Sequence, residues 1–237
     1  MVALVALVAL TSLAVWVAYA LPGQTPARVP AAAVEPSLIG SADAGDAVVV
    51  ARVDDVDVLL PVDRQATTAV AFHPVDNSGT VPFTPVGDRL GGGDLGQKLA
   101  DIFAGGGGVQ YYLMGGTGGE ESPSTSGLDI GSVPGAQVVS PVDGKITAIK
   151  DYSILGRHDD VEINIQMTSD PSLLLVVTHI EEPEVEIGEV VQRGTSVLGT
   201  VRGFPSSLEQ ALSQYTSDNG DHVQLFVLRV TPELTSL

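Results

Sequence analysis

Four histidines are the residues of this chain best suited to acid–base or metal chemistry, and two of them lie at the ends of apolar runs. His179 ends the run LLLVVTHI, and His222 begins the run HVQLFVLRV directly after the turn SDNGD. Strand ends next to loops are where a sheet commonly holds catalytic side chains. The alternative is that both are structural strand-end histidines. We expect His73, which precedes Pro74, and His158, in the polar turn GRHDD, to face solvent.

Composition excludes several other kinds of chemistry. The 237 residues contain no cysteine, so disulfides, thiolate metal sites and a cysteine nucleophile are excluded. The 11 basic residues against 29 acidic ones give a net charge of −18, which repels nucleic-acid phosphates and anionic lipids. The chain is therefore not expected to bind nucleic acid, and its composition fits an exported bacterial protein.

The elements that position His179 and His222 are predicted to be β-strands from Gly127 onward. In VEINIQM, apolar side chains alternate with Glu, Asn and Gln, which is typical of an antiparallel sheet with one buried face. A helix is expected at 206–215, with Ser206 or Ser207 as its cap. The predicted strands lie at 136–142, 144–152, 161–167, 173–180, 189–194, 196–203 and 222–230.

Five sequence blocks in this region carry a resemblance to a known family. They are GLDI, PGAQVVSPVDGKITAI, VVTHI, VEIGEVVQRGTSVLGTV and GDHVQL, in that order along the chain. Together they resemble the M23, or LytM-type, peptidase domain, a family of zinc endopeptidases that cut peptidoglycan cross-links. The resemblance implies an all-β main domain, an antiparallel β-sandwich or partly open barrel of the duplicated-hybrid-motif type. The glycine turns also occur in biotinyl and lipoyl carriers, but no lysine-bearing hairpin tip is visible.

The resemblance implies a site in which two of three zinc ligands are absent. Asp129 matches one ligand position, whereas Thr125 and Gln224 stand where the family has histidines. His179 and His222 match the two catalytic histidines that do not bind the metal. Because a hydroxyl and a neutral amide are poor zinc donors, we expect no zinc cofactor and vestigial catalytic positions. Restoring both ligands with Thr125→His and Gln224→His is expected to regain zinc affinity.

Three functions remain open at this point. The first is a catalytically inactive domain that binds peptidoglycan, or a cell-wall hydrolase or other envelope protein, and regulates wall hydrolysis. The second is an active zinc metalloendopeptidase in which His158 or Asp159 replaces a missing ligand. The third is a purely structural envelope protein. Three of these histidine and aspartate side chains within reach of one metal ion would favour the enzyme.

The first 21 residues indicate a membrane segment. Residues 2–21 are apolar apart from Thr11 and Ser12 and carry no charge, which is long enough to cross a bilayer as a helix. AYA at 18–20 resembles a cleavage site, although the basic start of a signal peptide is missing. We expect a single-pass membrane protein with an extracytoplasmic C-terminal domain, or a secreted protein if the segment is cleaved.

The remaining segments are predicted from composition. Residues 22–46 form a Pro/Ala-rich linker, and 47–86 form a small β-rich accessory region whose two apolar runs make a hairpin. Residues 87–124 form a Gly-rich linker with a short helix at 94–103. The main domain, similar to M23 peptidases, covers 125–237.

Overall fold

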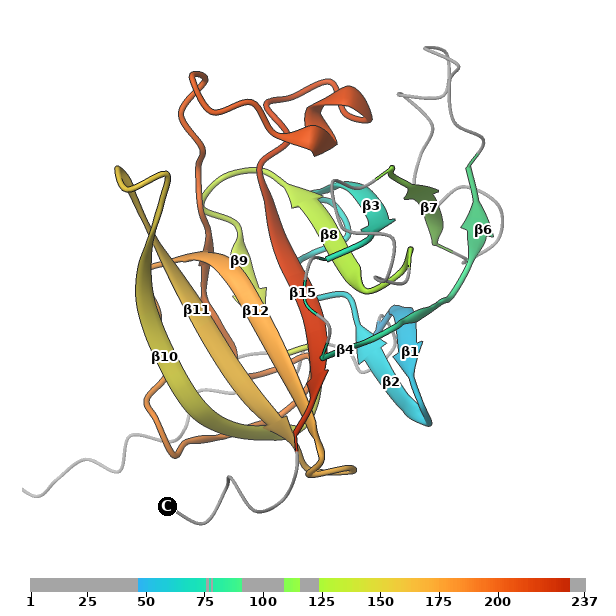
Figure 1. Ribbon diagram of the computed structural model, residues 1–237, viewed down its shortest axis with the longest axis vertical. Coiled ribbons are helices and arrows are strands. Elements are labelled where there is room, and N and C mark those ends of the chain that lie inside the picture. Colours follow the sequence, from blue (N-terminus) through green and yellow to red (C-terminus); the bar gives the residue numbers. More distant parts are fainter. Residues whose placement is uncertain (1–46, 76, 78, 91–108, 116–123, 231–237) are drawn as a thin grey trace, which may run out of the picture. The chain divides into compact units, whose positions relative to one another are not determined.

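The structure, a computed structural model, describes residues 47–75, 77, 79–90, 109–115 and 124–230, and the regular secondary structure of these residues is almost entirely β-strand (Figure 1). This agrees with the all-β fold predicted for the main domain. The predicted membrane segment at 1–21, the linker at 22–46 and the helix at 94–103 lie outside the described residues. Within the described residues no helix combines the length and apolar character needed to cross a bilayer.

The described elements follow one another with short connections. Up to residue 113 they are β1 (Val49–Val53), β2 (Val56–Leu59), β3 (Thr67–His73), β4 (Thr80–Val81), β5 (Thr84–Pro85), β6 (Asp88–Arg89) and β7 (Gln110–Leu113). From residue 127 they are β8 (Gly127–Ser132), β9 (Gln137–Val139), β10 (Gly144–Ile154), β11 (His158–Met167), β12 (Leu173–Glu181), β13 (Val190–Val191), β14 (Val197–Val201), the 3₁₀ helix η1 (Ala211–Gln214) and β15 (His222–Arg229).

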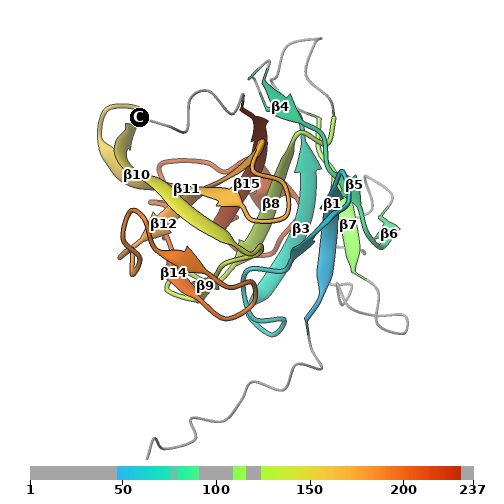
Figure 2. The same cartoon turned by 90° about the horizontal axis from the view of Figure 1, so that it is seen from below.

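One large sheet contains most of these strands. Its order is β13-β10-β11-β12-β15-β8-β3-β7-β6, with β14 and β9 paired beside β12, and β4 beside β15. Neighbours are antiparallel except β7, which runs parallel to β3 and to β6. Figure 2 shows the strands from β10 to β3 following one another around the interior. Strands β12, β15, β8 and β3 are thus adjacent, and these four strands carry the site described below.

The region 47–86 does not form the hairpin predicted from its two apolar runs. The hairpin, β1 with β2, lies within the first run, because the turn after Val53 places Asp54 at a φ of 48°. The second run is β3, which pairs antiparallel with β8. Strands β3 and β4 therefore extend the sheet of the main domain, whereas β2, β1 and β5 form a separate three-stranded sheet.

A single apolar core joins the early and late strands. It includes the fully buried Val50 and Phe72 from the first part of the chain, and Ile165 and Leu225 from the second. Burying a side chain of this size contributes roughly 1.5–3 kcal/mol. Residues 47–86 are therefore held to the rest by packing as well as by hydrogen bonds between strands.

The helix predicted at 206–215 is much shorter in the structure. Only Ala211–Gln214 are helical, as a 3₁₀ turn, and Gln210 rather than a serine is at the N-cap, with no side-chain capping bond. Leu212 is the one buried side chain of this turn. The burial of one side chain does not offset the unfavourable free energy of nucleating a longer helix.

Candidate functional site

Asp129 lies at the centre of a polar cluster because its strand is in the middle of the sheet. On one side, Asp129 of β8 is opposite Gln224 of β15, and on the other it is opposite Ala71 of β3. The Asp129 side chain is only 7% exposed. A carboxylate buried to this degree requires hydrogen-bond donors or cations around it.

The first donor is His73, which contradicts the prediction that this residue faces solvent. His73 ends β3, and its Nε2 lies 3.0 Å from Asp129 Oδ1 while its Nδ1 lies 2.9 Å from the carbonyl oxygen of Pro74. Both ring nitrogens thus face acceptors, which favours the doubly protonated ring. Burial alone would lower the pKa of His73, but the hydrogen bond and charge of Asp129 and the Pro74 carbonyl raise it above its ordinary value.

The second donor is Gln224. Its Nε2 lies 3.2 Å from Asp129 Oδ1 and 3.2 Å from His73 Nε2. Gly127 makes room for this arrangement, because a Cβ there would lie 2.7 Å from Cε1 and 2.8 Å from Nε2 of His73. Asp129 thus accepts hydrogen bonds from both His73 and Gln224, and we call these three residues the Asp129 cluster.

His222 lies beside the Asp129 cluster, and its pKa is shifted in the opposite direction from that of His73. Its Nδ1 is 2.8 Å from the Gly220 carbonyl oxygen, so Nδ1 carries the proton and Nε2, 3.8 Å from Asp129 Oδ1, has the free lone pair. Burial lowers the pKa of His222, outweighing the attraction of Asp129. Of the two rings next to Asp129, His73 is therefore the more readily protonated.

His179 adjoins His222 and is oriented by a second buried carboxylate. The two imidazole centroids lie 4.9 Å apart, and the ring of Phe204 stacks on His222 at 5.5 Å. His179 Nδ1 lies 2.6 Å from Asp160 Oδ2, and its backbone has a φ of 65°, a strained value for a residue other than glycine. The structure thus brings Asp129, His179 and His222 together, as the motif spacing predicts.

Asp160 was not among the residues singled out from the sequence, although its side chain is fully buried. It also accepts hydrogen bonds from the hydroxyl of Tyr152 at 2.8 Å and from the backbone NH of Val161. Burial would raise the pKa of Asp160, but these donors and His179 hold it below its ordinary value. The register of β11 against β12 shifts between Val161 and Ile163, and no local pattern reveals such a shift.

The other predicted site residues lie elsewhere. Thr125 is half-buried, and its carbonyl oxygen accepts the NH of Phe83 at 2.9 Å, whereas the side-chain hydrogen bonds to Asp129 come from His73 and Gln224. His158 pairs with Ile154 at the end of the β10–β11 hairpin, and Asp159 is exposed. Among the described residues, no three histidine or acidic side chains are placed to hold a metal ion.

Zinc, which the family resemblance implies, does not fit the residues as they are arranged. The Nε2 of His73 would have to lose its proton and leave Asp129 to present a lone pair. The amide of Gln224 faces Asp129 through nitrogen, a donor and not a metal ligand. The donor set that surrounds Asp129 is therefore suited to stabilising a carboxylate by hydrogen bonds.

The Asp129 carboxyl should give the protein a distinct sensitivity to acid. Burial alone would raise its pKa, but His222, His73 and His179 lower it from 3.8 to about 2. Because the pKa of Asp129 is lower in the folded than in the unfolded state, its ionised form stabilises the fold at pH values above the unfolded-state pKa. This stabilisation is lost as the pH falls from about 4 to about 2. At about 1.4 kcal/mol per pKa unit, the loss is on the order of 2 kcal/mol.

Urea unfolding of the wild type and of Asp129→Asn between pH 2 and 5 measures this loss. Because the amide does not titrate, the difference in unfolding free energy between the two proteins should shrink as the pH falls. A difference that stays constant across this range would contradict the assignment.

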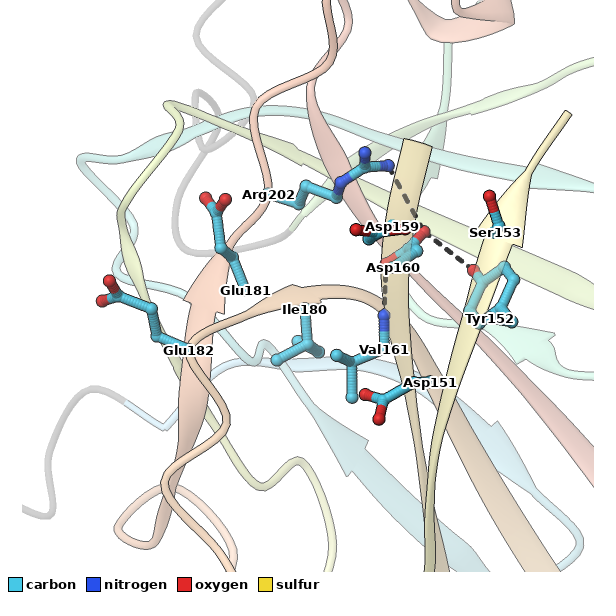
Figure 3. A pocket seen from close by; sticks show the side chains of 10 residues that line it. All are labelled: Asp151, Tyr152, Ser153, Asp159, Asp160, Val161, Ile180, Glu181, Glu182 and Arg202. Carbon is cyan, nitrogen blue, oxygen red and sulfur yellow. Dashed lines mark hydrogen bonds and ion pairs between the residues drawn. The ribbon is translucent and has the colours of Figure 1, made fainter. Parts of the chain in front are cut away.

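Beside His179 the surface contains a pocket of about 630 Å³. Its wall includes Asp160, so the pocket and His179 share one carboxylate. Figure 3 shows its side chains, which come from β10, β11, the end of β12 and the segment after β14. They are Asp151, Tyr152, Ser153, Asp159, Asp160, Val161, Ile180, Glu181, Glu182 and Arg202.

Comparison with known proteins gives matches among solved structures alone. No family model and no curated protein matches the chain. The solution structure of lysostaphin matches at 16% identity over 45% of this chain and 37% of that one, with a TM-score of 0.33. The M23 metalloprotease pseudoalterin from the deep sea matches at 18% identity over 73% and 70%, with a TM-score of 0.35.

A structure of the SpoIIQ–SpoIIIAH pore-forming complex also matches, at 17% identity over 70% of this chain and 90% of that one, with a TM-score of 0.32. A structure of a putative M23 peptidase from Pseudomonas aeruginosa and one of an M23 catalytic domain from Enterococcus faecalis are among the other matches. The chain spans little more than a third of the length of lysostaphin.

Proposed function

We propose that this protein is a membrane-anchored, extracytoplasmic binding module that recognises peptidoglycan peptides without hydrolysing them as a zinc peptidase. The observation that carries the proposal is the Asp129 cluster. Asp129, the position that corresponds to a zinc ligand, already accepts hydrogen bonds from His73 and Gln224. The pocket beside His179 is meanwhile open to a ligand.

The chemistry of the donors supports the loss of hydrolysis. A catalytic zinc site needs three protein donors and a fourth position for a water whose pKa the metal lowers to about 7. Gln224 replaces one donor with a neutral amide, and Thr125 offers only a hydroxyl, a weak donor to zinc. His179 and His222 then lack the metal-bound water on which they would act.

The anchoring part of the proposal rests on the sequence of residues 1–21. This uncharged segment and the Pro/Ala-rich linker at 22–46 would hold the domain outside the membrane, where peptide cross-links of the wall are accessible. Regulation of a wall hydrolase would follow if the domain covers or presents the same peptides.

Cosedimentation of the full chain in detergent with purified peptidoglycan tests this function. The protein should sediment with intact peptidoglycan and not with glycan strands from which the peptides have been removed. Incubation with added zinc should release no soluble peptides. Failure to sediment with intact peptidoglycan would contradict the binding function.

One observation favours a second candidate, an active zinc peptidase. His73 brings to Asp129 a histidine that the sequence motif does not contain, and with His222 it gives three side chains of suitable type. This candidate requires His73 to exchange its hydrogen bonds for a metal bond. Stoichiometric zinc in the purified wild type, together with peptide release that Asp129→Ala abolishes, would establish it in place of the binding module.

A further inference from the structure

The pocket beside His179 combines one buried cation with a rim of carboxylates. The four rim side chains, Asp151, Asp159, Glu181 and Glu182, are exposed. None of them has an ion-pair partner among the described residues. Arg202 lines the same pocket from the segment after β14 (Figure 3). This pocket is distinct from the Asp129 cluster, and the family motifs assign no role to its rim.

Arg202 is buried and lacks a hydrogen-bond acceptor for part of its guanidinium group. Its side chain is 9% exposed, and its Nη1 forms no hydrogen bond. The nearest carboxylate oxygen, Asp160 Oδ2, lies 3.6 Å from Nη1, which is an ion-pair distance and too long for a hydrogen bond. That oxygen, Oδ2, already accepts hydrogen bonds from His179 and Tyr152, while Oδ1 accepts one from the NH of Val161.

The guanidinium is held in this position by its surroundings. Its Cζ lies 5.1 Å from the centre of the Phe204 ring, and the backbone NH of Arg202 bonds to the carbonyl oxygen of His179 at 3.1 Å. A buried donor without an acceptor is costly, and a guanidinium binds planar carboxylates especially well. Arg202 is therefore suited to a ligand carboxylate that enters the pocket.

The rim carboxylates impose a second requirement on the ligand. A ligand carrying a carboxylate alone would be repelled by Asp151, Asp159, Glu181 and Glu182, and one carrying an ammonium alone would leave Arg202 without an acceptor. A group that carries a carboxylate and an ammonium on one carbon meets both requirements. Glu182, with a backbone φ of 50°, lies directly after Glu181 at the end of β12.

We infer that this pocket binds a zwitterionic amino-acid group, with its carboxylate on Arg202 and its ammonium on the rim formed by Glu181 and its acidic neighbours. The inference rests on the proposed function, which it deepens by naming the part of the peptide that is recognised. A peptide containing a diamino acid presents this zwitterion on a side chain, where it can enter a pocket without a free chain end.

NMR titration of the full chain in detergent micelles with three probes of similar length tests the inference. 2,6-Diaminopimelate carries the zwitterion, cadaverine carries ammonium groups alone, and pimelate carries carboxylates alone. Diaminopimelate should shift the signals of pocket residues, with binding at least about tenfold tighter than that of either other probe. Equal binding of cadaverine, or no binding of diaminopimelate, would overturn the inference.

Two variants and a control assign the contacts. Arg202→Gln and Glu181→Gln should each weaken diaminopimelate binding by about tenfold, whereas Glu184→Gln, an exposed change outside the pocket, should leave it unaltered. If Arg202→Gln does not fold, Glu181→Gln and the probe series still decide the outcome. Equal affinity in Glu181→Gln and the wild type would overturn the inference. Sedimentation with peptidoglycan in a protein that does not bind diaminopimelate would refute the pocket alone and leave the proposed function intact.

Discussion

Gln224→His should raise the zinc affinity of the protein by at least about a hundredfold. Position 224 faces Asp129 across β15 and β8, and His73 approaches the same carboxylate from β3. The substitution would thus complete a set of two histidines and one carboxylate on adjacent strands. Structural zinc sites gain on the order of 10 kcal/mol from about four ligands, so one restored ligand accounts for several kcal/mol.

Zinc content after equilibrium dialysis, followed by calorimetric titration, measures this gain. Gln224→Leu is the matched control, since it removes the amide without adding a donor. The double variant Thr125→His/Gln224→His, which the motif suggests, should gain little beyond Gln224→His, because His73 already lies beside Asp129. Equal zinc affinity in Gln224→His and the wild type would contradict this account of the Asp129 cluster.

Asp129→Ala should destabilise the protein by about 3–5 kcal/mol at neutral pH. The change leaves the ring NH of His73 and the amide NH of Gln224 without their shared buried acceptor. Removing one partner of a buried, hydrogen-bonded pair is costly because the remaining polar groups stay desolvated without an acceptor. Urea unfolding monitored by circular dichroism measures the loss of free energy.

A double-mutant cycle separates the ion pair from simple loss of packing. His73→Ala and the double variant His73→Ala/Asp129→Ala complete the cycle. The double variant should lose at least about 1 kcal/mol less than the sum of the two single variants, because the second substitution removes a charge that the first left unpaired. Strictly additive losses would show that the contact between His73 and Asp129 does not stabilise the fold.

Much of the late part of the fold could be predicted because its strands are locally encoded. The alternation around Ile163 and Ile165 predicted β11, and the order of the sequence blocks predicted that Asp129, His179 and His222 would meet. The same strand-end rule that selected His179 also applies to His73, which ends the run ATTAVAFH. Applied to that run as well, the rule would have identified His73 as a third histidine of the site.

Other features depend on contacts that no local pattern reveals. The pairing of β3 with β8 joins residues more than 50 positions apart, across a Gly-rich segment, and it decides that His73 lies beside Asp129. Asp160 looks like any other acidic residue of a polar turn, and its contact with His179 depends on the pairing of β11 with β12. Thr125 was assigned by motif alignment alone.

The pairing of β3 with β8 also has a practical consequence for how the protein is divided. A shortened chain that starts near Thr125, at the first motif that resembles the M23 domain, would lose β3 and with it His73. It would expose the hydrogen-bonding edge of β8, and an unpaired apolar edge promotes aggregation and strand exchange between copies. The unit suitable for expression therefore begins before Val48, whose carbonyl oxygen accepts a hydrogen bond from the NH of Leu60.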